Sequence, residues 1–156
     1  MRHRGIIHIV LVNLIVFFAL ISIHELGHSA GGILSGCKLQ KAVLMDANFV
    51  GPYTEMYCAD MNYALMLFSS FFITASFSFL FLLLKPPTRN LFFISLGLSI
   101  VFSSLDVIIA TNIQALIYPV ASLGFIITAL GEYFMASSAV KDSFPLDFID
   151  IEKEIS

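Results

Sequence analysis

Charged residues are scarce in this chain. Of its 156 residues only 12% are Asp, Glu, Lys or Arg, while 58% are hydrophobic. Soluble domains carry about 25% charged residues, so this composition excludes an ordinary soluble domain and favours one surrounded by lipid. Since a membrane-spanning helix needs about 20 apolar residues, the length allows roughly four or five spans and no second folded domain. We therefore expect residues 1–156 to form a single membrane-embedded domain.

Positive charge is also in short supply. The chain has 8 Lys and Arg against 11 Asp and Glu, which gives a formal net charge of −3. A protein that binds nucleic acid needs a basic surface that neutralises phosphates. The composition therefore predicts no nucleic-acid partner.

Cysteine is nearly absent, and the two that occur are Cys37 and Cys58. They could form a disulfide, ligate a metal or fill small apolar sites. Because cysteine in an apolar chain behaves mostly as a small buried hydrophobe, we favour the last interpretation.

Four long apolar segments predict an all-α membrane protein with four spans. They cover residues 6–36, 63–84, 91–110 and 113–139. The first segment is longer than the apolar core of a signal peptide and leads into His24 rather than a cleavage site, so we expect it to be retained. The turn at 85–90 contains two prolines and two basic residues and must leave the membrane. An acidic tail at 141–156 is expected to be solvated or to lie on a surface.

The connector from Cys37 to Asn62 is too interrupted to span a membrane. Two short runs of β-branched, aromatic and other apolar residues flank an Asp/Asn turn at 46–48. This pattern is typical of a β-hairpin, and an irregular membrane-associated loop is the alternative.

The chemistry-bearing motif is His24-Glu25-x-x-His28, late in the first span. Residues four apart on a helix lie about 40° apart around its axis, so both imidazoles can bind one zinc ion. Glu25 lies on a neighbouring face, where it could act as general base on a zinc-bound water without ligating the metal. The alternatives are a buried polar cluster, a metal-transport site and a degenerate enzyme.

A catalytic zinc site normally takes three protein ligands, so one is missing. Asp106 lies 15 residues into the third span, which runs in the same direction as the first, and its depth differs from that of His24 by only about 5–10 Å. Glu132 lies late in a span of opposite direction and should be far from the histidines. We therefore predict Asp106 as the third ligand; the alternatives are that the site has no third carboxylate or that Asp60 supplies it.

Glycines that follow the motif and two asparagines elsewhere in the chain allow further predictions. Gly27, Gly31, Gly32 and Gly36 would either let another helix approach closely or leave an open face for an extended substrate. Asn13 is expected to form an interhelical hydrogen bond. Asn112 would either form a turn or donate to an oxyanion.

These motifs resemble the site-2 protease family of intramembrane zinc metalloproteases. The resemblance rests on His24-Glu25-Leu26-Gly27-His28 in the first span and on Leu105-Asp106 in a later one. It implies zinc held by His24, His28 and Asp106, cleavage of substrate helices, and in some members a membrane-associated hairpin after the first helix. The chain departs from the family's longer motif, having Leu98, Val101, Ser103 and Val107 where the family has Asn, two prolines and Gly. It is identified as a small, divergent member.

We therefore predict a zinc-dependent intramembrane metalloendopeptidase, a multi-pass protein of a prokaryotic cell membrane. Its catalytic base is Glu25 and its metal ligands are His24, His28 and Asp106. Its partners would be the bilayer and a transmembrane or membrane-proximal protein substrate. The alternatives are a membrane metal-binding or transport protein, which should have further ligands through the membrane, and a non-catalytic partner that binds membrane segments.

Two arguments about orientation conflict. Arg2, Arg4, Lys85 and Arg89 lie at one side against Lys38 and Lys41 at the other, which predicts that both chain ends are cytoplasmic. The family resemblance predicts the opposite, because it implies a metal nearer the cytoplasmic face. On the sequence alone we follow the family.

Overall fold

The computed structural model describes residues 2–43, 53–59, 62–111 and 113–143. The longest helix is α1 (Arg2–Leu34), which is followed by strands β1 (Lys38–Val43) and β2 (Tyr53–Tyr57). Helix α2 (Tyr63–Phe79) continues into the 3₁₀ turn η1 (Leu80–Leu83), and a second turn, η2 (Thr88–Asn90), leads into α3 (Leu91–Thr111). The turn η3 (Gln114–Leu116) precedes α4 (Ile117–Ser143).

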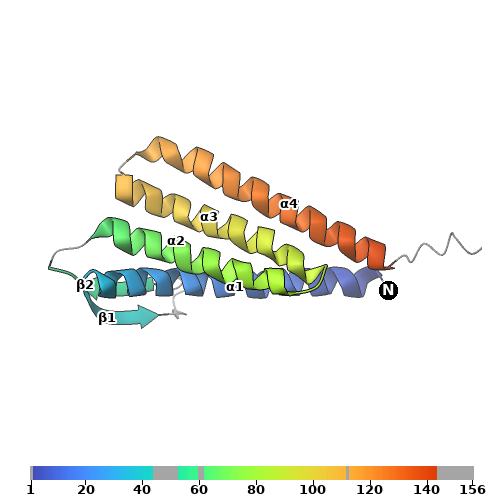
Figure 1. Cartoon of the computed structure of the whole chain (residues 1–156), viewed down its shortest axis with the longest axis horizontal. Helices are drawn as coiled ribbons and strands as arrows, with labels where there is room; N and C mark the ends of the chain where they lie inside the picture. The colour runs from blue at the N-terminus through green and yellow to red at the C-terminus, as the bar shows by residue number, and fades with distance from the viewer. Residues whose placement is uncertain (1, 44–52, 60–61, 112, 144–156) are drawn as a thin grey trace, which may run out of the picture.

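Four helical segments are long and apolar enough to cross a membrane, and successive helices run in opposite directions (Figure 1). They cover Ile9–Leu34, Ala64–Leu83, Thr88–Val107 and Gln114–Ser138. The hairpin lies at the end of the bundle opposite the start of α1. The predicted fold class, four transmembrane helices with a small hairpin after the first, is confirmed.

The helix ends differ from the predicted span limits by a few residues. Helix α1 begins at Arg2 and ends at Leu34, two residues before the predicted limit. Gly36 adopts a φ of 85°, which glycine tolerates, and the amide of Cys37 donates to the carbonyl of Gly32. This six-to-one bond is typical of a helix that stops at a left-handed glycine.

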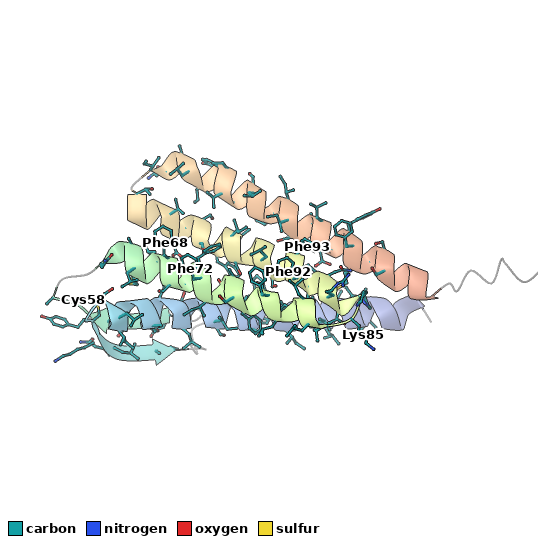
Figure 2. The ribbon with its side chains drawn as sticks, in the orientation of Figure 1. Cys58, Phe68, Phe72, Lys85, Phe92 and Phe93 are labelled. Atoms are coloured by element: carbon teal, nitrogen blue, oxygen red, sulfur yellow. A yellow bond between two sulfur atoms is a disulfide. The ribbon has the colours of Figure 1, made fainter. Side chains whose placement is uncertain are left out.

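The packing is inverted relative to a soluble protein. Large apolar side chains stand out from the helices (Figure 2), and Phe68 and Phe72 are 59% and 63% exposed. The buried interior combines an apolar cluster around Leu20 and Ile94 with many small hydroxyl residues, among them the fully buried Ser70, Ser95 and Ser99. Most donate to a backbone carbonyl three or four residues earlier, as Ser99 does to Ser95. The apolar exterior suits lipid, and small side chains let the helices approach closely.

Glycines mark the two closest helix contacts. A side chain at Gly27 or Gly31 would collide with the backbone of α2 near Ser70 and Met66. Both glycines therefore serve helix packing, because α2 covers the face of α1 that an extended substrate would have needed. Gly97 of α3 packs against Gly124 of α4 in the same way; a Cβ at Gly97 would lie 2.6 Å from the carbonyl oxygen of Gly124.

The connector after α1 forms the predicted hairpin. Strands β1 and β2 pair antiparallel, from Lys38 opposite Tyr57 to Val43 opposite Tyr53, with an irregularity between Leu39 and Lys41. The turn expected at 46–48 lies outside the described residues, as does most of the acidic tail.

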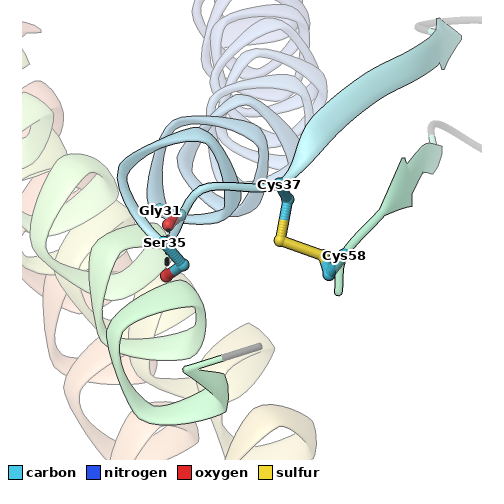
Figure 3. The surroundings of a disulfide bond; sticks show 4 residues. All are labelled: Gly31, Ser35, Cys37 and Cys58. Atoms are coloured by element: carbon cyan, nitrogen blue, oxygen red, sulfur yellow. Dashed lines mark hydrogen bonds between the residues drawn. A yellow bond between two sulfur atoms is a disulfide. The ribbon is translucent and has the colours of Figure 1, made fainter. Parts of the chain in front are cut away.

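The interpretation of Cys37 and Cys58 as unpaired apolar residues is wrong. They form a disulfide across the open end of the hairpin (Figure 3), with their Cα atoms 4.3 Å apart. The reason is the strand register. Lys38 lies opposite Tyr57, so Cys37 and Cys58, the next residues outward, also lie opposite each other. The bridge joins the end of α1 to the segment that leads into α2.

Candidate metal centre

The two histidines of the motif lie on one face of α1, one helical turn apart. Their ring centroids are 4.7 Å apart and the rings are almost perpendicular. His24 is buried and His28 is partly buried, so both rings lie inside the bundle rather than in lipid. An apolar helix has no packing need for two buried imidazoles, which makes a shared ligand the natural partner.

Asp106 of α3 faces both rings. Its Oδ2 atom lies 3.2 Å from Nε2 of His24, and its Oδ1 atom lies 3.3 Å from Nε2 of His28. One potential ligand atom from each of the three residues lies within 4.8 Å of the others, so the group could hold a metal ion. The depth argument had predicted this meeting of α1 and α3. Metal binding itself stays a prediction.

Two of the distances between these atoms, one from each carboxylate oxygen of Asp106, are compatible with a shared ion. Zinc bonds of 2.0–2.1 Å in a tetrahedron place neighbouring ligand atoms about 3.3–3.4 Å apart. The two contacts of Asp106, at 3.2 and 3.3 Å, lie close to that separation. A charge-assisted hydrogen bond between imidazole and carboxylate is usually shorter, about 2.7–2.9 Å. The donor set of two imidazole nitrogens and one carboxylate oxygen also suits zinc.

Two residues of α2 hold the ligands in place. Nδ1 of His28 lies 3.3 Å from the carbonyl oxygen of Met66, which can accept only from an N–H. That bond leaves the lone pair on Nε2, the nitrogen that faces Asp106. The Ser70 hydroxyl lies 3.1 Å from Oδ2 of Asp106 and 2.7 Å from the carbonyl oxygen of Leu67, so its one hydrogen is shared between these two acceptors.

The sequence prediction did not include Met66 or Ser70. The sequence cannot point to the carbonyl of Met66, because every residue has a backbone carbonyl. Ser70 could have been found by the depth argument, since it lies seven residues after the start of α2 at the same end of the bundle.

His24 is held through Nε2, which contacts Asp106, and through the packing of its ring. Its Nδ1 atom is buried and has no hydrogen-bond partner among the described residues. The ring of Phe102, from the turn of α3 before Asp106, lies 5.9 Å away between centroids. A buried imidazole nitrogen without a partner is costly, so the other nitrogen must supply the interaction that keeps the ring here.

Glu25 lies beside the group at the half-buried edge of α1. Its carboxylate interacts electrostatically with His24, His28 and Asp106. Its backbone carbonyl accepts a hydrogen bond from Ser29, whose hydroxyl lies 3.0 Å from that of Thr54 in β2. The hairpin is therefore attached to the same turn of α1 as the motif.

The other polar candidates are elsewhere. Glu132 accepts a hydrogen bond from the side-chain amide of Asn13 at 2.5 Å, which confirms the interhelical bond predicted for Asn13. Asn13 lies 11 residues before His24 on α1, or about 16 Å along the helix axis. Glu132 is thus remote from the histidines, as the depth argument predicted. Asp60 and Asn112 lie outside the described residues.

Comparison with models of known families, with curated proteins and with solved structures finds no match to this chain. The resemblance to site-2 proteases therefore rests on the motif around His24 and on Leu105-Asp106. Function has to be argued from the residues of the site.

Proposed function

We propose that the protein is a zinc-dependent peptidase that cleaves other proteins within or beside the membrane. The observation that supports this best is the meeting of Asp106 with the Nε2 atoms of both motif histidines at 3.2 and 3.3 Å. Three protein ligands leave one position for substrate or water, which is typical of catalytic rather than structural zinc sites. A zinc ion bound there would act as a Lewis acid and lower the pKa of its water to ~7.

Glu25 is the residue that would move the proton. It follows His24 directly and precedes His28 by three residues, so its carboxylate adjoins the ligand group without belonging to it. As general base, its carboxylate would accept a proton from the attacking water and pass it to the departing amine. Met66 and Ser70 would keep the His28 ring and the Asp106 carboxylate oriented throughout.

The surroundings favour a membrane-embedded substrate. The ligand group lies inside helices whose outer surface is apolar, so a substrate would reach it from the bilayer or from its edge. A substrate helix hides its carbonyls in backbone hydrogen bonds and must unwind locally before hydrolysis. The hairpin, attached to α1 through Thr54, could hold the unwound segment by adding it as a strand. We place such a multi-pass enzyme in a prokaryotic cell membrane.

Metal transport is the less supported alternative. A transporter needs a path of ligands through the membrane. Within the described ranges, His24, His28 and Asp106 form the only group of three or more residues able to hold an ion.

The proposal is tested by Glu25→Gln in purified protein reconstituted with zinc in liposomes. The probe is a fluorogenic library of membrane-spanning peptides. The variant keeps the shape of the side chain but removes the base, so we expect cleavage to fall about 10²–10⁴-fold. Zinc content by mass spectrometry should not change, because Glu25 is not a ligand.

The matched control is Glu132→Gln on α4, which keeps a hydrogen-bonding partner for Asn13 far from the histidines and should cleave normally. Undiminished cleavage by Glu25→Gln, or absence of cleavage by the wild-type protein across the library, contradicts the proposed function.

A further inference from the structure

A cavity of about 460 Å³ lies beside the candidate metal centre, on the side away from α1. Its walls come from α2, α3 and α4, with Leu67, Phe71 and Val120 among the residues that line it. Asp106 also lies in its wall. The cavity therefore adjoins the ligand group directly, and its volume is in the range of protein pockets that hold small ligands.

One polar group in this wall has no explanation in the fold. Ser103 lies one turn before Asp106 and is 8% exposed. Its hydroxyl oxygen is buried and has no hydrogen-bond partner among the described residues, whereas Ser104 next to it donates to the carbonyl of Val101. The cavity wall is otherwise apolar and covers this oxygen, so an occupant reaches it only by displacing neighbouring side chains; a polar group that did so would be stabilised there.

We propose that this cavity is a subsite that takes a large apolar side chain of the substrate, next to the bond that is cleaved. The proposal rests on the proposed peptidase function. Because Asp106 borders the cavity, a peptide whose scissile bond lies at the ligand group would place a neighbouring side chain in it. An acyl chain of a lipid would fill the apolar walls but has no group to pair with Ser103. A peptide has both the side chain and, in its backbone, the hydrogen-bonding group.

The test is crosslinking, which does not require cleavage. Membrane-spanning peptides with one benzophenone side chain, scanned along the sequence, are mixed with the protein in lipid nanodiscs. We expect crosslinks to the cavity walls at Leu67, Phe71 or Val120. Val120→Phe fills the cavity from α4 and should lower their yield at least about 10-fold. Val10→Phe, the same change at an exposed position of α1, should not.

Two further variants keep the proposal testable if Val120→Phe does not fold. Val120→Ala enlarges the cavity and should shift cleavage towards larger residues, and Ser103→Ala should weaken peptide binding about 5–10-fold by removing one hydrogen bond. Equal crosslinking by Val120→Phe and Val10→Phe, or crosslinks that avoid the cavity, overturns the subsite. Crosslinking to the cavity without any hydrolysis by the wild-type protein supports the subsite and refutes the peptidase.

The disulfide supports a second inference, about orientation. Cys58 and Lys85 lie at opposite ends of the bundle (Figure 2). The hairpin end has the Cys37–Cys58 bridge, and the other end has the basic residues Arg2, Arg4, Lys85 and Arg89. Disulfides persist in oxidising compartments, and excess Lys and Arg marks cytoplasmic loops. The two observations are independent and agree.

We infer that the hairpin end faces the outside of the cell membrane. His28 lies six residues before the end of α1, and Asp106 lies five residues before the end of α3. The candidate metal centre is therefore nearer the outer face, and its substrates are segments that lie near that face. This reverses the orientation that we had taken from the family resemblance, because the bridge adds to the charge bias.

Cysteine labelling in intact cells tests the orientation without reference to activity. Thr88→Cys, in the exposed η2 turn, should react with a membrane-impermeant maleimide only after the cells are opened. Gln40→Cys, exposed on β1, should react in intact cells, and Cys37 and Cys58 should resist labelling until a reductant is added. Labelling of Thr88→Cys in intact cells, or free thiols at Cys37 and Cys58, overturns the inference.

Discussion

At the scale of single residues, the carboxylate of Asp106 connects the site. Each of its oxygens faces one imidazole, and Oδ2 also accepts from Ser70. A charged group is costly to bury in a membrane protein unless it is paired, and these contacts supply the pairing. The carboxylate of Glu132, on α4, has its own partner in Asn13 and is remote from the histidines.

Replacement of these two carboxylates should have different results. We expect Asp106→Ala to lose peptidase activity and to bind zinc more than about 100-fold more weakly, since even an outer hydrogen-bond partner costs 10–100-fold. Glu132→Ala should retain both properties. Zinc titration by calorimetry measures the difference, and full zinc occupancy in Asp106→Ala would exclude it as a ligand.

Ser70 should show the smaller effect of an outer partner. Ser70→Ala removes the donor to Asp106, so zinc affinity should fall about 10–100-fold while three ligands remain. Ser78→Ala is the control, because both serines are fully buried on α2 and donate to a carbonyl of that helix, but Ser70 also contacts Asp106. Equal zinc affinities of the two variants would show that Ser70 does not orient the carboxylate.

At the scale of elements, the close approach of α1 and α2 positions the site. Gly27 and Gly31 lie four residues apart on one face of α1 and allow the backbone of α2 to come near. This approach brings the carbonyl of Met66 to His28, while the contact of α2 with α3 brings the hydroxyl of Ser70 to Asp106. The metal centre therefore depends on two positions that ligate nothing.

A larger residue at Gly31 should separate the helices. A Cβ there would lie 2.7 Å from Cα of Met66, so Gly31→Leu forces α2 away and should cost about 1–3 kcal/mol of stability. We expect a lower melting temperature and weaker zinc binding. Ala129→Leu, a similar enlargement at an exposed position of α4, should change neither. A Gly31→Leu protein with normal zinc affinity would show that the contact is not needed.

At the scale of the whole molecule, the disulfide closes a loop that includes the hairpin. Cys37 and Cys58 are 21 residues apart, and the bridge links the last turn of α1 to the approach to α2. A two-stranded hairpin is only marginally stable by itself. Its contact with α1 through Ser29 and Thr54 and the covalent bridge together hold it near the site.

Removal of the bridge should loosen the hairpin and spare the metal. A crosslink over a loop of this length contributes about 3 kcal/mol, mainly by restricting the open state. In the Cys37→Ser, Cys58→Ser double variant, we expect trypsin to cut after Lys38 or Lys41 up to about 100-fold faster. Zinc content should stay normal, since all three ligands lie on helices. An unchanged rate of trypsin cleavage would show that the disulfide is not needed to keep the two strands paired.

Some features of this protein follow from local sequence alone. The four spans follow from apolar runs, because a helix in lipid satisfies its backbone within one segment. The histidine pair follows from helical spacing, and the hairpin from two short runs around a turn. The depth of each residue along its span was enough to predict that Asp106, and not Glu132, lies beside the histidines.

Other features depend on how segments distant in sequence come together. The pairing of Cys37 with Cys58 depends on strand register. The role of Met66 depends on which faces of α1 and α2 meet, and that of Ser70 on which faces of α2 and α3 meet. The cavity beside Asp106 needs three helices at once. Periodicity assigns a residue to a face of its own helix, but only the packed bundle determines which neighbour that face contacts.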